Sequence, residues 1–472
     1  MNADILTAQK EIDRKAIDGL LQQSLQDLNK KIIVLDDDPT GVQTVHDISV
    51  YTDWTEESLT KAFQEENSMF FILTNSRGFT AAETEAAHTD IANMVVKVAN
   101  AQKKDFLIIS RGDSTLRGHY PLETETLRKT VEAATEKVFD GEILLPFFKE
   151  GGRYTMNNIH YVQNGDELIP AGETEFAKDR TFGYTKSHLG EWIEEKTNGA
   201  YKAADAAYIS LDDIRSMNID SITGQLMNVK DFGKVIVNAI DEYDVKIFTI
   251  ALVNCLKKGK NFLFRSAAAL PKVIGGVDNR PLLTREELIK EETGNGGLII
   301  IGSHVKKTTE QLDELKKLED ITFIEFNSHL VLQKDKFKEE CDRVIENCET
   351  LISSGKTVAV YTSRERLDLG PDRKEEELKM SVEISDAVTS IVTRLQVKPN
   401  FLIAKGGITS SDVGTKGLRV KRATVLGQVK PGIPVWLTGN ESKFPGMSYV
   451  IFPGNVGTKT DLKDVVDMLQ HN

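Results

Sequence analysis

The chain has 472 residues, too many for one ordinary hydrophobic core, so two or three domains are expected. Its net charge of -13 at pH 7 argues against nucleic acid or an anionic membrane as the main partner, although local basic residues could still bind an anion. The three cysteines lack metal-ligand spacing, and no stretch reaches the roughly 18 consecutive apolar residues of a membrane span. We therefore expect a soluble, cytoplasmic protein with reduced thiols.

The first 30 residues are charged throughout and lack the apolar core of a signal peptide. Apolar residues such as Ile12, Ala16 and Leu20 have the spacing of an amphipathic helix. This pattern predicts an N-terminal helical extension over residues 1–30.

Short apolar runs alternate with charged helical segments along the rest of the chain. Continuous apolar runs without polar alternation are typical of parallel strands that helices cover on both faces. Helices are predicted between them, for example over 81–100 and 121–139. The predicted strands are 32–35, 70–73, 106–109, 143–145, 208–210, 235–237 and 247–250, followed by 298–301, 322–325, 358–361, 401–404, 435–437 and 449–452.

A polar segment over 278–297 ends in a Gly/Asn cluster and is typical of a linker. The alternation on either side of it predicts an α/β protein of two domains, each with a mainly parallel sheet flanked by helices. The first domain would span residues 31–280, the linker 281–297 and the second domain 298–472. The active site is expected in the cleft between them, since interdomain clefts are common ligand sites.

Three consecutive carboxylates, Asp36, Asp37 and Asp38, directly follow the first predicted strand. In open α/β sheets, ligands bind beyond the carboxyl ends of the strands, and crowded carboxylates there need water, a cation or ligand donors. The alternative is a solvated turn, because the Pro, Thr and Gly that follow also favour turns.

Two further predicted strands end in polar loops, one with Asn75 and Arg77, the other with Arg111, Asp113 and Ser114. If the strands are parallel, all these ends share one sheet edge. The arginines could bind a carboxylate or phosphate through bidentate donors, and an aspartate could take a proton from a hydroxyl. Together the residues indicate a pocket for a small polyhydroxy acid.

Each of these residues also has a structural interpretation. Arg77 and Arg117 could pair with surface carboxylates, Arg111 could form a local ion pair, and Ser114 could cap the next helix. The glycine-rich segment 147–155 has cationic neighbours and could be a lid over the same pocket or a plain surface loop.

Glycine loops follow several predicted strands of the second half. Gly302 and Ser303 come after 298–301 and open a helical stretch, an arrangement that favours phosphate binding but lacks Walker A spacing. Residues 405–409 read Lys-Gly-Gly-Ile-Thr, and such glycines let backbone N–H groups approach a phosphate, the alternative being an ordinary turn before a helix. Residues 453–455 repeat the pattern, and no loop matches G-x-G-x-x-G, which argues against a dinucleotide dehydrogenase.

In order and character, these motifs resemble those of the four-carbon acid sugar kinase family over nearly the whole chain after about residue 30. The motifs are Asp36-Asp37-Asp38-Pro-Thr40-Gly41, Asn75-Ser-Arg77, the loop from Arg111 to Thr115, Gly302-Ser303, Lys405-Gly-Gly-Ile-Thr409 and Pro453-Gly454-Asn455. The resemblance implies a sugar-binding N-terminal domain, a nucleotide-binding C-terminal domain and MgATP-dependent phosphorylation of a tetronate such as threonate, erythronate or 3-oxo-tetronate.

By position, the resemblance also implies which residues act. Substrate contacts would come from Asp37, Arg77, Arg111, Asp113 and Ser114, with Asp37 or Asp113 as the catalytic base. ATP contacts would come from Ser303, Gly406, Gly407, Ile408, Thr409 and Gly454. The expected partners are a sugar acid, ATP and Mg²⁺, with no nucleic acid or membrane, and a homodimer is left open. The alternatives are a sugar-acid isomerase or aldolase and a non-catalytic regulator that binds a sugar acid or a nucleotide.

Overall fold

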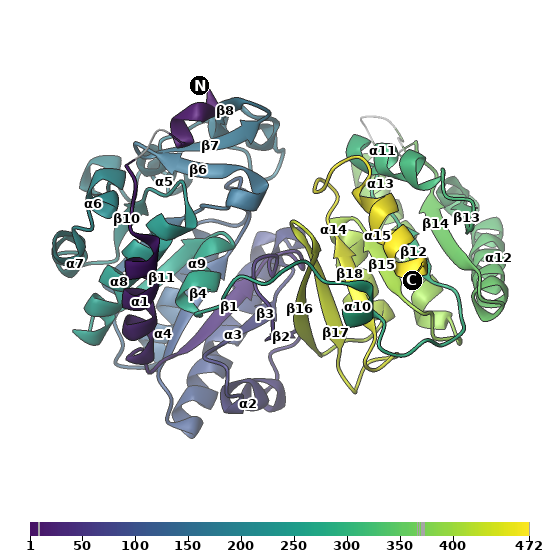
Figure 1. Ribbon diagram of the computed structural model, residues 1–472, viewed down its shortest axis with the longest axis horizontal. Helices are drawn as coiled ribbons and strands as arrows, with labels where there is room; N and C mark the ends of the chain where they lie inside the picture. The colour runs from purple at the N-terminus through teal and green to yellow at the C-terminus, as the bar shows by residue number, and fades with distance from the viewer. Residues whose placement is uncertain (8–9, 366, 368, 370–372, 472) are drawn as a thin grey trace. The chain divides into compact units, whose positions relative to one another are not determined.

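The computed structural model describes residues 1–7, 10–365, 367, 369 and 373–471 (Figure 1). The chain divides into two compact units, the first made of Met1–Gly41 and Asp53–Asn279, the second of Val42–Thr52 and Arg280–Asn472. Both units combine a mainly parallel sheet with helices, which confirms the predicted α/β class. No helix among these residues is long and apolar enough to cross a membrane.

The main sheet of the first unit has the strand order β3-β1-β4-β11-β5-β10-β9, with all neighbours parallel. Every residue of the five strands β3, β1, β4, β11 and β5 is buried, so helices cover both faces of the sheet. The strand bounds are β1 Lys31–Asp36, β3 Met69–Leu73, β4 Phe106–Arg111, β5 Gly141–Leu145, β9 Ala207–Ile209, β10 Gly233–Val237 and β11 Phe262–Ser266.

Two groups of helices pack around this sheet (Figure 1). In one group α3 packs between α2 and α4, and in the other α8 packs against α1, α6, α7 and α9. The predicted N-terminal helix is α1, which buries Ile17 and Leu21. The helix bounds are α1 Arg14–Gln26, α2 Glu56–Gln64, α3 Ala81–Gln102, α4 Leu122–Ala134, α5 Leu189–Lys196, α6 Leu211–Arg215, α7 Ile219–Met227, α8 Glu242–Lys257 and α9 Ala269–Ile274.

The strand prediction for 247–250 is wrong, because these residues lie inside α8. A short apolar run does not distinguish a buried strand from a buried helix, and a capping box formed by Asp241 and Asp244 begins the helix here. Strand β11 was not predicted, because Arg265 interrupts its apolar run. A small antiparallel sheet was omitted too, formed by β6 Arg153–Met156, β7 Ile159–Asn164 and β8 Glu167–Pro170.

The sheet of the second unit has the order β13-β14-β12-β15-β18-β17-β16-β2. The first five strands are parallel, and the last three continue the sheet antiparallel. Strand β2 comes from the N-terminal part of the chain and pairs with β16, with Ile48 opposite Val425. The bounds are β2 Ile48–Tyr51, β12 Leu298–Ile301, β13 Ile321–Phe326, β14 Thr357–Thr362, β15 Leu402–Lys405, β16 Arg422–Lys430, β17 Ile433–Thr438 and β18 Ser448–Phe452.

The helices of the second unit again form two packed groups, α10 and α11 against α15, and α12 and α14 against α13. The short helix α10 lies within the polar segment predicted as a linker, and its Leu288 is part of the second unit's hydrophobic core. The helix bounds are α10 Arg285–Leu288, α11 Lys306–Leu315, α12 Lys334–Ser353, α13 Lys374–Arg394, α14 Gly407–Asp412 and α15 Asp461–Gln470.

Candidate functional site

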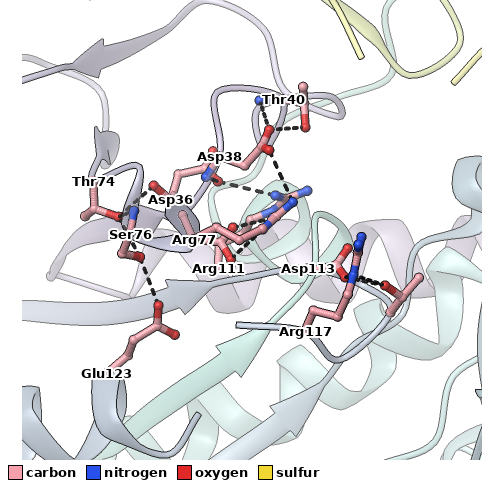
Figure 2. A network of polar contacts seen from close by, with 12 residues as sticks. Asp36, Asp38, Thr40, Thr74, Ser76, Arg77, Arg111, Asp113, Arg117 and Glu123 are labelled. Carbon is pink, nitrogen blue, oxygen red and sulfur yellow. Dashed lines mark hydrogen bonds and ion pairs between the residues drawn. The ribbon is translucent and has the colours of Figure 1, made fainter. Parts of the chain in front are cut away.

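The polar loops of the first unit lie at one edge of its sheet. Asp36, the last residue of β1, is in register with Leu73 of β3 and Arg111 of β4, and Arg111 is in register with Ser266 of β11. The three loops predicted to converge therefore do so, and Figure 2 shows Arg77 and Arg111 bonded to the aspartates after β1, with the Asp113–Arg117 pair beside them as a separate group. Parallel strand order brings about this convergence, since all these strands end on the same side.

Asp36 is enclosed by its own loop. Its Oδ1 lies 3.3 Å from Nη1 of Arg111, and both side chains are buried. A Cβ on Gly41 would lie 1.9 Å from Asp36 Oδ2, so only glycine lets the loop fold back over this carboxylate. Burial outweighs the attraction of Arg111 and raises the pKa of Asp36 to about 7. The Asp36–Arg111 pair thus anchors the loop to the sheet.

Arg77 forms ion pairs with the next two carboxylates, those of Asp37 and Asp38. Its Nη2 and Nε donate to the two carboxylate oxygens of Asp37 at 2.6 and 3.2 Å, and Nη1 reaches Asp38 at 3.2 Å (Figure 2). Burial raises the pKa of Asp37 even though Arg77 opposes the rise. Burial would also raise the pKa of Asp38, but Arg77 and hydrogen bonds from Thr40 bring it below its ordinary value. Two adjacent aspartates therefore differ in how readily they accept a proton.

In the third loop Asp113 is held as a carboxylate. Its Oδ2 accepts hydrogen bonds from Thr115 Oγ1 and from Arg117 Nε, the latter at 2.7 Å. Burial alone would raise the pKa of Asp113, but Arg77 and Arg117 lower it far below the ordinary value. Asp113 is therefore a hydrogen-bond acceptor with little affinity for a proton.

Ser114 is buried and fixed through its main chain. His160 Nε2 donates to the carbonyl oxygen of Ser114 at 2.8 Å, while His160 Nδ1 accepts from Thr155 Oγ1 at 3.0 Å. Burial lowers the pKa of His160 to about 4, so the imidazole is neutral near pH 7. His160 thus positions the loop from the small sheet β6-β7-β8.

Two residues that were not predicted, Arg265 of β11 and Glu123 of α4, contact the residues of this network. Arg265 donates to the carbonyl oxygen of Arg117 at 2.8 Å and lies 4.0 Å from Glu123, which accepts from Ser76 at 2.9 Å. A Cβ on Gly112 would lie 1.2 Å from Arg265 Nη1, which explains the glycine at that position. An arginine inside an otherwise apolar run was the available signal for Arg265.

In the second unit, glycine loops meet at the ends of β12, β15 and β18. Lys405, the last residue of β15, is in register with Ile301 and Phe452. A Cβ on Gly302 would lie 2.3 Å from Thr409 Oγ1, and one on Gly406, whose φ is +124°, would lie 2.9 Å from Ser303 Cβ. The structure therefore brings the Gly302–Ser303 loop against the Gly406–Thr409 loop.

Three more residues predicted to contact the nucleotide lie at this edge. A Cβ on Gly454 would be 3.3 Å from Ser303 Oγ, Gly407 begins α14, and the Ile408 side chain is 73 % exposed. Glycines and an outward-pointing isoleucine leave backbone N–H groups as the donors that these loops can offer to a phosphate.

Two basic side chains beside the loops have no carboxylate partner among the residues that the structure describes. Lys405 Nζ donates to the carbonyl oxygens of Pro453 and Gly454, and burial lowers its pKa to about 7. Arg364 donates from Nη2 to Ser303 O at 2.7 Å and to Thr309 Oγ1 at 2.9 Å, while its Nε and Nη1 are buried without a hydrogen-bond partner. Buried donors without acceptors are costly, and a phosphate would satisfy them. Arg364 was not predicted, because no glycine motif marks the loop after β14.

In the part of the chain that the structure describes, no group of three or more His, Cys, Asp and Glu side chains could hold a metal ion. The aspartates after β1 are instead paired with arginines. In proteins that bind nucleotides, Mg²⁺ is usually held by phosphates, water and one or two carboxylates rather than by a protein cage. No protein ligand is therefore assigned to Mg²⁺.

The fold is that of a two-domain protein in which each domain has one cluster of loops at the ends of its parallel strands. Residues 32–274 match the family model of a sugar-binding N-terminal domain, and residues 298–462 match that of a nucleotide-binding C-terminal domain. The chain belongs to the four-carbon acid sugar kinase family, which confirms the resemblance seen in its motifs.

Solved structures share the fold at low sequence identity. Haemophilus influenzae protein HI1011 is 16 % identical, with a TM-score of 0.60 over 93 % of this chain and 100 % of that one. A protein described as a putative tRNA synthase from Salmonella typhimurium LT2 is 15 % identical, with a TM-score of 0.65 over 93 % of this chain and 98 % of that one. No curated protein sequence matches the chain.

Proposed function

We propose that the protein is an ATP-dependent kinase that phosphorylates a hydroxyl of a four-carbon sugar acid such as threonate, erythronate or 3-oxo-tetronate. The observation that carries this proposal is Asp37, a buried carboxylate with a raised pKa that Arg77 orients at the strand edge of the sugar-binding domain. The glycine loops of the nucleotide-binding domain supply the second requirement, a site for the phosphates of ATP.

Asp37 is better suited than Asp113 to accept the hydroxyl proton. A general base works best when its pKa lies near the operating pH. The raised pKa of Asp37 moves it in that direction, whereas Arg77 and Arg117 hold the pKa of Asp113 low despite its burial. We assign Asp37 as the base and Asp113 as a fixed acceptor that orients a substrate hydroxyl.

The residues of the second domain fit the phosphates of ATP. Backbone N–H groups of residues 406–409 and the Ser303 hydroxyl can donate to phosphate oxygens, and Arg364 has two buried N–H groups available for the same purpose. MgATP supplies the phosphoryl group and the divalent charge that such transfers use. Positioning and charge stabilisation by these donors account for most of the catalysis expected here.

The proposal is tested by measuring ADP formation in a coupled assay with each stereoisomer of threonate, erythronate and 3-oxo-tetronate. We expect ADP release that depends on the acid and a phosphorylated acid of matching mass. A parallel thermal-shift screen of C3 to C6 sugar acids, with and without a non-hydrolysable MgATP analogue, identifies the ligands that bind. Binding of a sugar acid without any ATP consumption across the panel would contradict the kinase assignment.

A further inference from the structure

One arginine near the Asp113 loop has no carboxylate partner. Arg153, the first residue of β6, forms no ion pair within the described part of the chain, and its buried Nε has no hydrogen-bond partner. The other arginines of the cluster each contact a carboxylate: Arg77 with Asp37 at 2.6 Å, Arg111 with Asp36 at 3.3 Å, Arg117 with Asp113 at 2.7 Å and Arg265 with Glu123 at 4.0 Å. Arg111 Nε and Arg265 Nη1 also lack a hydrogen-bond partner, so what distinguishes Arg153 among these arginines is that it has no ion pair within the described residues.

Arg153 shares the Phe176 ring with Arg117, which is paired with the predicted substrate residue Asp113. Its guanidinium carbon is 5.6 Å from the centre of the Phe176 ring, and that of Arg117 is 5.1 Å from the same ring. Arg117 is held in place by Asp113 and, at 3.8 Å, by Asp179. A Cβ on Gly151 would lie 2.8 Å from Arg153 Nη1, so the glycine leaves room for the guanidinium.

The unpaired state of Arg153 is unfavourable without a ligand. Burial lowers its pKa, the direction expected for a cation taken out of water, and Asp113 only partly offsets the effect. A buried donor without an acceptor is costly, whereas a carboxylate can accept two parallel hydrogen bonds from a guanidinium. An anionic ligand would therefore supply the acceptor that the buried Arg153 guanidinium lacks and would make its burial favourable.

We propose that Arg153 binds the carboxylate of the acid substrate and so determines which end of that molecule faces Asp37. This inference rests on the proposed function, which supplies the sugar acid. The two ends of the site are close: a Cβ on Gly118, the residue after Arg117, would lie 3.5 Å from Asp37 Oδ2. The proposal requires that one small acid place its carboxylate at Arg153 and a hydroxyl at Asp37.

The first experiment compares Arg153→Gln with the wild type, using calorimetric binding of the best tetronate and steady-state kinetics. We expect the Kd and KM for the acid to rise about 10- to 100-fold, the range for loss of a charge-assisted hydrogen bond, with the KM for ATP unchanged. Lys149→Gln is the matched control, because Lys149 precedes the same strand but pairs with Asp241 and is 55 % exposed. The control should leave both constants unchanged.

A second readout separates carboxylate binding from a structural role. The tetritol of the same stereochemistry lacks the carboxylate, so Arg153→Gln should weaken binding of the acid and leave binding of the tetritol unchanged. Arg153→Lys, which keeps the positive charge, should restore part of the affinity for the acid. The melting temperature of ligand-free Arg153→Gln should equal or exceed that of the wild type, because the variant loses a buried unpaired charge.

The possible outcomes distinguish this inference from the proposed function. If the wild type binds no sugar acid, the proposed function fails and this inference fails with it. If the wild type binds the acid and Arg153→Gln binds it equally well, only the inference about Arg153 is overturned. An equal loss for acid and tetritol, or a ligand-free variant that melts well below the wild type, would show that Arg153 is structural and would overturn the inference as well.

Discussion

At the ends of β1, β3 and β4, carboxylates and arginines form ion pairs that neutralise one another. Beside the loops after β12, β14 and β15, by contrast, the polar partners of Lys405 and Arg364 within the described part of the chain are backbone carbonyls and a hydroxyl. Both clusters lie where parallel strands end, so the sheet does not cause the difference. The difference fits the two proposed ligands. A sugar acid carries one negative charge and needs one free cation, while ATP carries several and is matched by unpaired cations and many N–H groups.

The comparison also separates the ways in which the two clusters are fixed. In the first domain, side-chain ion pairs set the positions of the functional groups, and these pairs shift pKa values by burial and by charge. In the second domain, close approaches at glycines fix the backbone of the loops, and few side chains take part in holding the loops in place. Substitutions of charged residues should therefore act mainly on the first site, and added Cβ atoms mainly on the second.

Asp37→Asn should have the largest effect on the first site. We expect kcat to fall about 10²- to 10⁴-fold, the usual contribution of a general base, while the affinity for the acid changes little. Asp38→Asn is the control, because Asp38 also contacts Arg77 but has a lowered pKa. Steady-state kinetics measure kcat, and calorimetry measures the Kd for the acid. Near wild-type turnover of Asp37→Asn with binding intact would show that Asp37 is not the base.

Asp36 should make stability depend on pH. Its pKa is about 7 in the folded protein and about 3.9 in an unfolded chain, so between these values only the folded state holds this proton. Its contribution to stability is therefore present at low pH and is lost as pH rises through about 7, by about 4 kcal/mol at most at 1.36 kcal/mol per pKa unit. The contribution of His160 to stability depends on pH in the opposite sense, because its pKa of about 4 in the folded protein is below the ordinary 6.5, so that this contribution is lost as pH falls.

Urea unfolding of the wild type and Asp36→Asn between pH 4 and 8 isolates the contribution of Asp36, since His160 is common to both. The stability of the wild type should fall relative to the variant as the pH rises. Asp38→Asn should not reproduce this trend, because the folded pKa of Asp38 is lowered. A constant difference between wild type and Asp36→Asn across this range would contradict the raised pKa.

Gly406→Ala should impair the second site and spare the first. The new Cβ would lie 2.9 Å from Ser303 Cβ at a φ of +124°, so the loop must shift. We expect the Kd for an ATP analogue to rise about 10- to 100-fold, because overpacking costs about 1–3 kcal/mol, with sugar-acid binding unchanged. Gly294→Ala is the control, as it has a φ of +74° but no atom within 4 Å of the new Cβ. Unchanged nucleotide affinity in Gly406→Ala would argue against these loops as the phosphate site.

Arg364→Gln should have the smallest effect of the four. Loss of its two buried, unpartnered N–H groups should raise the KM for ATP about 10-fold, near the lower end for a hydrogen bond to a charged group. Arg343→Gln, which removes a surface ion pair with Glu340, serves as the control. If both variants have the wild-type KM for ATP, Arg364 does not contact the phosphates.

The sequence predicted the convergence of Asp36, Arg111 and the loop after β3 correctly, because strongly apolar runs indicate parallel strands and parallel strands end at one edge. It failed for 247–250, where a buried helix and a buried strand have the same composition. It also gave no sign that residues 48–51 pair with β16, because pairing across a separation of this length leaves no local pattern.

By itself, then, the sequence determined the α/β class and the positions of the charged and glycine-rich loops, which follow from local hydrophobic pattern and residue type, while its motifs indicated the family by resemblance. The tertiary structure alone decided that Arg77 pairs with Asp37, that the pKa values of Asp37 and Asp113 shift in opposite directions, and that Arg153 Nε is buried without a hydrogen-bond partner among the described residues. The physical reason is that pairing and desolvation depend on which residues are brought together and buried, and both are properties of the packed fold.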